Sequence, residues 1–214
     1  MRRRALRIVA LGTLLVEAAC GGTRATLPYY TDRTLTPRWP AGSTTALHRI
    51  GDFTLVDQRG DTVRGRDVAG RVYVASFFYT TCRSLCPTVR SELATVRDAF
   101  RDDTLVTILS HTVTPEQDDV AALAHYARRN GIDGRGWRLL TGTRAEIERL
   151  ARERYFVELR DTTGNTTGAL RHTETLVLVD GAGHIRGVYE GSLAFEVRQL
   201  IEDVRVLRGN GRDS

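Results

Sequence analysis

Residues 72–87 read VYVASFFYTTCRSLCP and carry the strongest structural signal in the chain. The first eight of them form a nearly continuous apolar run, which is typical of a strand buried on both faces. Pro87 suits the first turn of a helix, because the N–H that it lacks would have no partner there. The apolar residues that follow share one helical face: Val89, Leu93, Val96 and Phe100. The stretch therefore predicts a buried strand that leads through Cys82 and Cys86 into a helix.

Further strand patterns lie on both sides of this stretch. A short strand is expected at 53–56, and a second buried strand is expected at 104–109. Two more apolar segments, 175–179 and 185–189, flank the turn sequence DGAG at 180–183. Such a turn between two strand patterns predicts an antiparallel hairpin.

Capping signals predict the remaining helices. Helix starts are expected at Thr114, which is followed by Pro115 and Gln117, and at Thr143, which is followed by Glu146. A last helix is expected to bury five apolar residues: Val197, Leu200, Ile201, Val204 and Leu207.

This order of elements predicts a thioredoxin-like α/β fold, with a central mixed sheet flanked by helices. In such a fold a redox-active pair lies at the end of the first long strand and the start of its helix, which is where Cys82 and Cys86 fall. The domain is expected to span residues 46–208, with a disordered tail at 209–214.

The N-terminus has the pattern of an export signal. Residues 1–19 combine a cluster of arginines, a short apolar run and small residues before Cys20. A cysteine after two alanines is similar to a bacterial lipobox, in which that cysteine is lipidated, although Glu17 stands where a leucine is usual. We therefore expect a bacterial envelope protein, anchored to the membrane through a lipid on Cys20, with a flexible tether at 20–45.

The charge balance does not favour a nucleic-acid-binding protein. The formal net charge is +5, and all 31 basic residues are arginines. Four of them lie within the first seven residues, and the others alternate with acidic residues instead of forming a basic stripe.

The sequence leaves three roles open for Cys82 and Cys86. In an oxidising compartment, two cysteines separated by three residues form a structural disulfide, a redox pair or a metal site. A helix N-terminus stabilises a thiolate through its free N–H groups and its dipole, which favours the two chemical roles over the structural one.

A histidine adds a third possible ligand. Thioredoxin-like reductases carry a cis-proline just before the penultimate strand, but the last proline of this chain is Pro115. His172 precedes that strand instead, and the fold directs it at the cysteine loop. Two thiolates and one imidazole suit Cu(I), and they accept Cu(II) with a weak extra ligand. Zinc accepts similar ligands but normally adds a fourth.

The motifs resemble those of the SCO/SenC family, the copper-binding thioredoxin-like proteins that help to assemble the copper A centre of cytochrome c oxidase. The resemblance runs from about Gly51 to Gly191 and rests on four segments. These are the entry strand GDFTLVDQ, the FYTTC to CP core, the segment SHTVTPEQD and the segment HTETLVLVD with Gly183 after it. The resemblance implies that Cys82, Cys86 and His172 are copper ligands.

Four positions depart from the family pattern. Arg83 and Ser84 replace the usual Pro and Asp between the cysteines, and Arg171 replaces an Asp before the histidine. Thr114 stands where the segment after the second strand commonly has an Asp. The expected ligands are retained, but some of their usual acidic neighbours are not.

Two functions follow as alternatives. The first is a metallochaperone that passes copper to the copper-bearing oxidase subunit or to another copper chaperone. The second is a thiol–disulfide oxidoreductase that reduces target cysteines with the same pair. A thiol peroxidase ranks last, because the usual proline before Thr81 is missing. The remaining histidines are interpreted as residues without a ligand role: His111 in a loop, and His48, His125 and His184 exposed to solvent.

Overall fold

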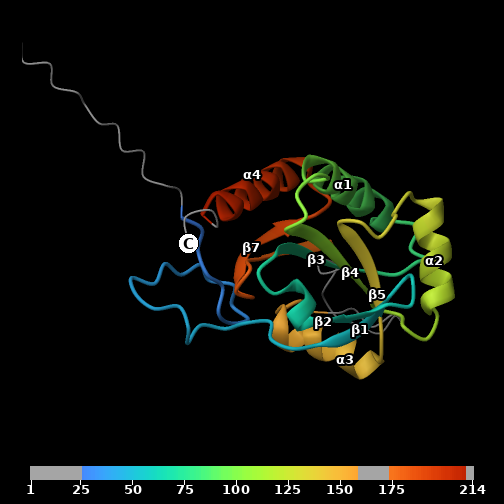
Figure 1. Cartoon of the computed structure of the whole chain (residues 1–214), viewed down its shortest axis with the longest axis horizontal. Coiled ribbons are helices and arrows are strands. Elements are labelled where there is room, and N and C mark those ends of the chain that lie inside the picture. The colour runs from blue at the N-terminus through green and yellow to red at the C-terminus, as the bar shows by residue number, and fades with distance from the viewer. Residues whose placement is uncertain (1–25, 159–173, 211–214) are drawn as a thin grey trace, which may run out of the picture.

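The computed structural model describes residues 26–158 and 174–210. Its core is one mixed sheet of seven strands in the order β2-β1-β5-β4-β3-β6-β7 (Figure 1). The strands are β1 (Thr54–Asp57), β2 (Thr62–Arg64), β3 (Val72–Phe78), β4 (Val106–Thr112), β5 (Trp137–Thr141), β6 (Thr175–Val179) and β7 (Ile185–Glu190). The helices are α1 (Cys86–Ala99), α2 (Val120–Arg129), α3 (Arg144–Arg149) and α4 (Ala194–Asn210), with a 3-10 turn at Gly65–Val68 and a π-helical turn at Leu150–Arg154.

The apolar run of β3 lies in the middle of the sheet and is buried along its whole length. It pairs parallel with β4, which pairs parallel with β5, and it pairs antiparallel with β6. Helices α1, α2 and α4 cover one face of the sheet, and α3 covers the other (Figure 1). The predicted thioredoxin-like fold, with a mixed sheet between helices, is confirmed.

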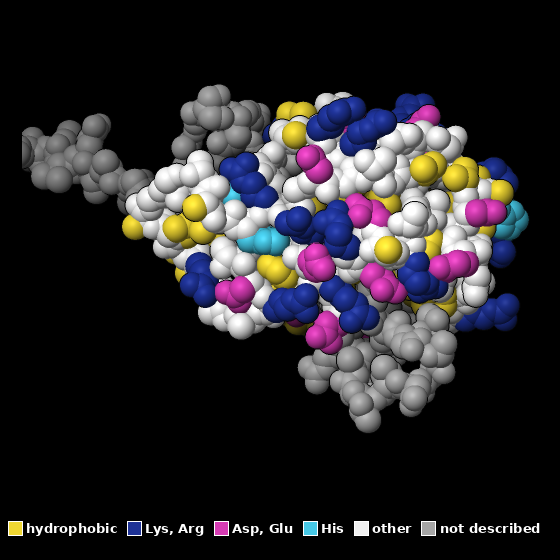
Figure 2. Space-filling model, turned by 90° about the horizontal axis from the view of Figure 1, so that it is seen from below, with side chains coloured by type: hydrophobic (Ala, Val, Ile, Leu, Met, Phe, Trp, Pro, Cys, Tyr) yellow, Lys and Arg dark blue, Asp and Glu magenta, His cyan; other side chains and the backbone are white. Residues whose placement is uncertain are grey.

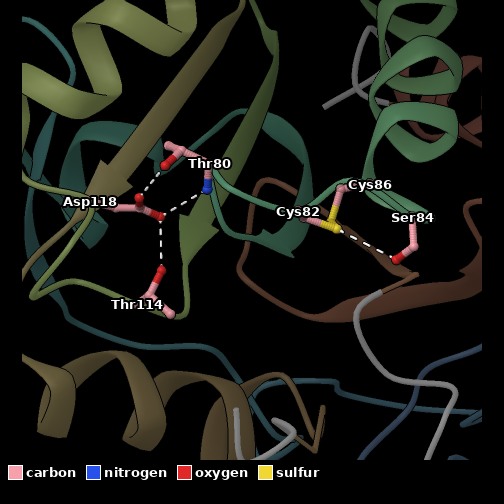
Figure 3. Close-up of a disulfide and its surroundings, with 6 residues drawn as sticks. All are labelled: Thr80, Cys82, Ser84, Cys86, Thr114 and Asp118. Carbon is pink, nitrogen blue, oxygen red and sulfur yellow. Dashed lines mark hydrogen bonds between the residues drawn. A yellow bond between two sulfur atoms is a disulfide. The ribbon is translucent and has the colours of Figure 1, made fainter.

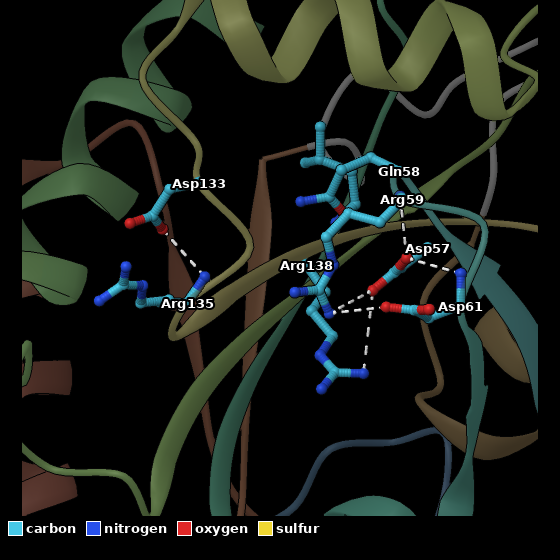
Figure 4. Close-up of polar contacts among 8 residues, drawn as sticks. Asp57, Gln58, Arg59, Asp61, Asp133, Arg135 and Arg138 are labelled. Carbon is cyan, nitrogen blue, oxygen red and sulfur yellow. Dashed lines mark hydrogen bonds and ion pairs between the residues drawn. The ribbon is translucent and has the colours of Figure 1, made fainter.

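Strand β5 was not predicted, and side chains at the end of β1 hold it in place. The backbone N–H of Leu139 donates to the Gln58 side-chain oxygen at 2.9 Å. The Asp57 carboxylate is fully buried, with Arg59 at 3.1 Å and Arg138 at 3.9 Å (Figure 4). Two charged partners compensate the desolvation of this carboxylate at the junction of β1 and β5.

The predicted helix start at Thr114 is wrong. Helix α2 begins at Val120, and its N-cap is Asp119, whose side chain accepts from the Ala122 N–H at 2.8 Å. The Thr114 hydroxyl does not cap a helix, because it donates to the Asp118 carboxylate at 3.0 Å. The second predicted start is confirmed, since the Thr143 hydroxyl accepts from the Glu146 N–H.

The chain before the domain is described from residue 26, and part of it is held against β7. The Arg186 guanidinium donates to the carbonyls of Leu27 and Pro28 and stacks on the Tyr29 ring at 3.9 Å. Tyr30 adds a backbone bridge to Ile185. The segment around residues 27–30 is therefore packed on the edge of the sheet.

Both signs of charge alternate over the face that carries α3, which is the face seen in Figure 2. Arg144 forms an ion pair with Glu116, and Arg149 forms one with Glu146. Among the described residues, no helix is both long enough and apolar enough to span a membrane.

Candidate functional site

The two predicted cysteines lie together where β3 meets α1. Cys82 and Cys86 form a disulfide with a Cα–Cα distance of 5.9 Å (Figure 3). Cys86 is the first residue of α1, one position earlier than the proline that was expected to open the helix. Its sulfur therefore lies at the end of a helix where backbone N–H groups lack intrahelical partners, an arrangement that stabilises a thiolate once the bond is reduced.

The two sulfurs differ in their access to solvent. Cys86 is only 7% exposed and lines a small, mostly apolar cavity with Phe78, Val89 and Leu93. Cys82 is more exposed, and its sulfur lies 3.9 Å from the Ser84 hydroxyl. A partner molecule approaching from solvent therefore reaches the Cys82 sulfur first.

A buried carboxylate anchors the start of the cysteine loop. Asp118 is 1% exposed and accepts from the Thr80 N–H at 3.1 Å. The hydroxyls of Thr80 and Thr114 donate to the same carboxylate (Figure 3), and so does the hydroxyl of Thr112. No local pattern indicates this role, because Thr80 and Asp118 are 38 residues apart and come together only when β3 pairs with β4.

His111 is not in a loop, as the sequence had suggested. It lies within β4, it is fully buried, and its ring stacks on Phe77 and contacts Tyr155. Its Nδ1 lies 3.3 Å from the Ser76 carbonyl, while its Nε2 has no hydrogen-bond partner in the part of the chain that the structure describes. Burial lowers the pKa of His111 to about 4, so the imidazole is neutral near pH 7.

The other described histidines are structural or exposed. His184 is 2% exposed and its Nδ1 lies 2.9 Å from the His48 carbonyl, so the expectation that it is solvated is wrong. His48 is part-buried, stacks on Phe156 and contacts the Arg154 carbonyl, and burial lowers its pKa. His125 is exposed on α2, as predicted.

Three glutamates, Glu174, Glu190 and Glu196, lie near one another at the same end of the sheet as the cysteine loop, and the sequence did not single them out. The Ser192 hydroxyl donates to Glu174 and to Glu190, and the Glu190 N–H donates to Glu196. Desolvation, followed by the hydrogen bond and charge of Glu174, raises the pKa of Glu190 to about 7. This end of the molecule therefore carries negative charge next to β6.

Two predicted site residues, Cys20 and His172, lie outside the described residues. Within residues 26–158 and 174–210, no three His, Cys, Asp or Glu side chains converge to form a metal site. The structure thus brings together Cys82 and Cys86, and the ligand role of His172 stays a prediction.

The sequence matches a known family over most of its length. The model of the SCO1/SenC family matches residues 41–207. The SCO1 protein homolog of Bacillus subtilis is 25% identical over 160 residues, which cover 74% of this chain and 82% of that protein.

Solved structures of similar fold include a protein with copper bound and a lipoprotein. Bradyrhizobium japonicum ScoI with copper bound has a TM-score of 0.58 at 26% identity, over 73% of this chain and 98% of that one. BsSco, a member of the Sco family of cytochrome c oxidase assembly proteins with a disulfide switch, has a TM-score of 0.65 at 24% identity, over 74% and 92%. A SCO1/SenC family lipoprotein from Bacillus anthracis has a TM-score of 0.63 at 21% identity, over 75% and 95%.

Proposed function

The chain belongs to the SCO1/SenC family, and on that basis we propose that it is a copper-binding assembly factor for the copper A centre of cytochrome c oxidase. Cys82, Cys86 and His172 are the proposed ligands. The observation that carries the proposal is the joining of two sulfurs at the start of α1, with one of them accessible to a partner. The copper-bound structure of the Bradyrhizobium relative supports the choice of metal.

Copper binding requires the disulfide to be opened first. Reduction by an external dithiol adds two electrons and two protons and gives two thiols, which lose their protons when they bind the metal. Two thiolates and a neutral imidazole form a soft set of three ligands, which suits Cu(I). A thiolate of the target protein then displaces the ligands one at a time, and we propose that exchange starts at the more exposed Cys82.

The metal site is tested by titrating reduced protein with Cu(I) in competition with a coloured chelator. Cys20→Ser serves as the background, so that Cys82 and Cys86 are the only thiols. His172→Ala is expected to weaken one-to-one binding by about tenfold or more, because one of three ligands is lost. His125→Ala, which removes an exposed histidine of α2, is the matched control and is expected to bind like wild type. Equal affinity in both variants would exclude His172 as a ligand.

A thiol–disulfide oxidoreductase is the second candidate, and the disulfide with its one accessible sulfur favours it. In this function the Cys82 thiolate attacks a target disulfide and Cys86 resolves the mixed disulfide, so the target leaves as a dithiol and the pair is oxidised. His172→Ala is then expected to leave turnover unchanged while it weakens copper binding. Turnover that falls with His172→Ala would contradict a pure dithiol mechanism.

We also propose that the protein is exported and anchored through a lipid on Cys20. The signal-like residues 1–19 and the Bacillus anthracis lipoprotein of the same family support this location. Growth of a bacterial host with a radioactive fatty acid is expected to label the wild type and not Cys20→Ser. If the Cys20→Ser variant is still labelled, the lipid is not attached to Cys20 and the proposal is wrong.

A further inference from the structure

The loop between β3 and α1 has few internal contacts of its own. Within residues 81–84, the described hydrogen bonds are one turn contact from the Cys82 N–H to the Tyr79 carbonyl and the weak contact between Cys82 and Ser84. The loop is therefore fixed mainly at its two ends. Helix α1 fixes Cys86, and the residues just before Cys82 fix the other end.

Asp118 makes the attachment at that other end. Its carboxylate accepts from both the N–H and the hydroxyl of Thr80, two residues before Cys82 (Figure 3). The hydroxyls of Thr112 and Thr114 hold the same carboxylate from the end of β4, at 2.5 and 3.0 Å. A backbone bond from Val113 to Phe78, of 2.8 Å, supports the junction.

The four donors explain why a carboxylate is buried here. Among the described residues, no arginine or histidine forms an ion pair with Asp118. Three neutral hydroxyls and one N–H therefore donate the hydrogen bonds that water would give to an exposed carboxylate. An isolated carboxylate at 1% exposure would be strongly destabilising, whereas one with four donors is held in a single position. Asp118 is thus a rigid point to which the loop is attached.

We propose that Asp118 is a positioning residue that keeps Cys82 close to Cys86 when their disulfide is open. In the oxidised protein the S–S bond holds the two residues, and the Asp118 contacts add to a geometry already fixed. In the reduced protein that bond is absent, and the Thr80–Asp118 attachment limits how far Cys82 moves. A high effective concentration of the two thiols favours disulfide formation, and it also favours the binding of one metal ion by both sulfurs.

The proposal rests on the chemical use of the cysteine pair, and its main test does not involve copper. Protein with the Cys20→Ser background is equilibrated with glutathione, where one oxidised glutathione and the protein dithiol give two reduced glutathiones and the protein disulfide. Asp118→Asn keeps the size of the side chain but replaces one accepting oxygen with an NH₂ donor. The equilibrium constant for disulfide formation is expected to fall about tenfold in the folded variant, because the weakened attachment lets Cys82 move further from Cys86 in the reduced form and lowers the effective concentration of the two thiols.

Three further variants separate positioning from stability alone. Glu116→Gln removes an exposed carboxylate from the loop between β4 and α2, which also contains Asp118. Glu116 bonds Arg144 and not Thr80, so this variant is expected to leave the equilibrium constant for disulfide formation unchanged. Thr80→Val removes the hydroxyl donor if Asp118→Asn fails to fold, whereas Thr80→Ser retains that donor and is expected to restore the wild-type constant. If Asp118 had only a structural role, its substitution would lower the free energy of unfolding equally in the oxidised and reduced forms. The equilibrium constant for disulfide formation would then stay unchanged.

Copper titration of the same variants gives the second measurement. Asp118→Asn is expected to weaken Cu(I) binding by a factor similar to that for disulfide formation. Changes below twofold in the glutathione constant for both Asp118→Asn and Thr80→Val would overturn the positioning role. If instead the wild type fails to bind Cu(I) while the glutathione constant still falls, the copper function fails and the positioning role stands.

Discussion

In the reduced protein, Cys86→Ser is expected to weaken Cu(I) binding by more than about a thousandfold, because a hard hydroxyl replaces one of two soft sulfur ligands. Cys82→Ser is expected to do the same. Competition with a coloured Cu(I) chelator measures both affinities. Thr88→Ser, an exposed change in the same turn of α1, is the control that retains both sulfurs.

The two serine variants are expected to differ in thiol chemistry, because their sulfurs differ in exposure. Cys86→Ser leaves the accessible Cys82 thiol without a resolving partner, so it should accumulate as a stable mixed disulfide with glutathione. In the Cys20→Ser background, Cys82→Ser leaves only the 7% exposed Cys86, which should react much more slowly. Mass spectrometry follows the added glutathione over time. Faster modification of Cys82→Ser would reverse the assignment of the attacking sulfur, and tight one-to-one Cu(I) binding by either variant would exclude a two-sulfur site.

The fold could be predicted where neighbouring residues in the sequence form a pattern that indicates a strand, a helix start or a turn. The run of β3, the proline in the first turn of α1 and the DGAG hairpin between β6 and β7 each depend on neighbouring residues, and each is confirmed. Strand β5 was missed because WRLLT is short, carries a charged Arg138 and follows a glycine-rich loop. Its place in the sheet depends on Gln58 and Asp57, about 80 residues earlier.

The site was predictable only in part, for a related reason. Two cysteines beside a helix start form a local motif, so their pairing at the end of β3 could be expected. Thr114 and Pro115 match the sequence pattern of a helix start. The Thr114 hydroxyl, however, donates a hydrogen bond to Asp118, and the helix begins later, at Val120. No local pattern reveals that Asp118 also contacts Thr80, because that contact exists only after two distant strands pair.

The loop between β3 and α1 has a fixed base and an accessible tip. Its base is Thr80, which Asp118 holds, and the buried Cys86, whereas Leu85 at the tip is exposed. Arg83 and Ser84 occupy that tip, where the family commonly has Pro and Asp. Both side chains are exposed and lie outside the packed core. These two departures therefore alter the surface of the loop, while β3, β4 and α1 hold the base of the site.

Acid is expected to destabilise the folded protein through His111, in addition to any effect of its carboxylates. The pKa of His111 is about 4 in the folded protein, below the ordinary value of 6.5. Between these two values the unfolded chain binds a proton that the folded chain excludes, so stability is lost as the pH falls from about 6.5 towards 4. The full depression corresponds to a loss of about 3 kcal/mol of unfolding free energy.

Urea unfolding at pH 7 and pH 4.5 measures this loss. His111→Phe removes the titrating group and retains a ring between Phe77 and Tyr155, and the unpartnered Nε2 disappears with it. The variant is expected to lose about 2 kcal/mol less than wild type between the two pH values, whatever its stability at pH 7. His125→Gln, at an exposed position on α2, is expected to follow the wild-type pH dependence. Because Glu190 has a raised pKa, it gains its proton more readily when folded and opposes the trend, but it does so equally in all three proteins. The difference between wild type and His111→Phe therefore isolates the buried imidazole, and equal acid sensitivity in the two would show that His111 is not excluded from protonation in the folded state.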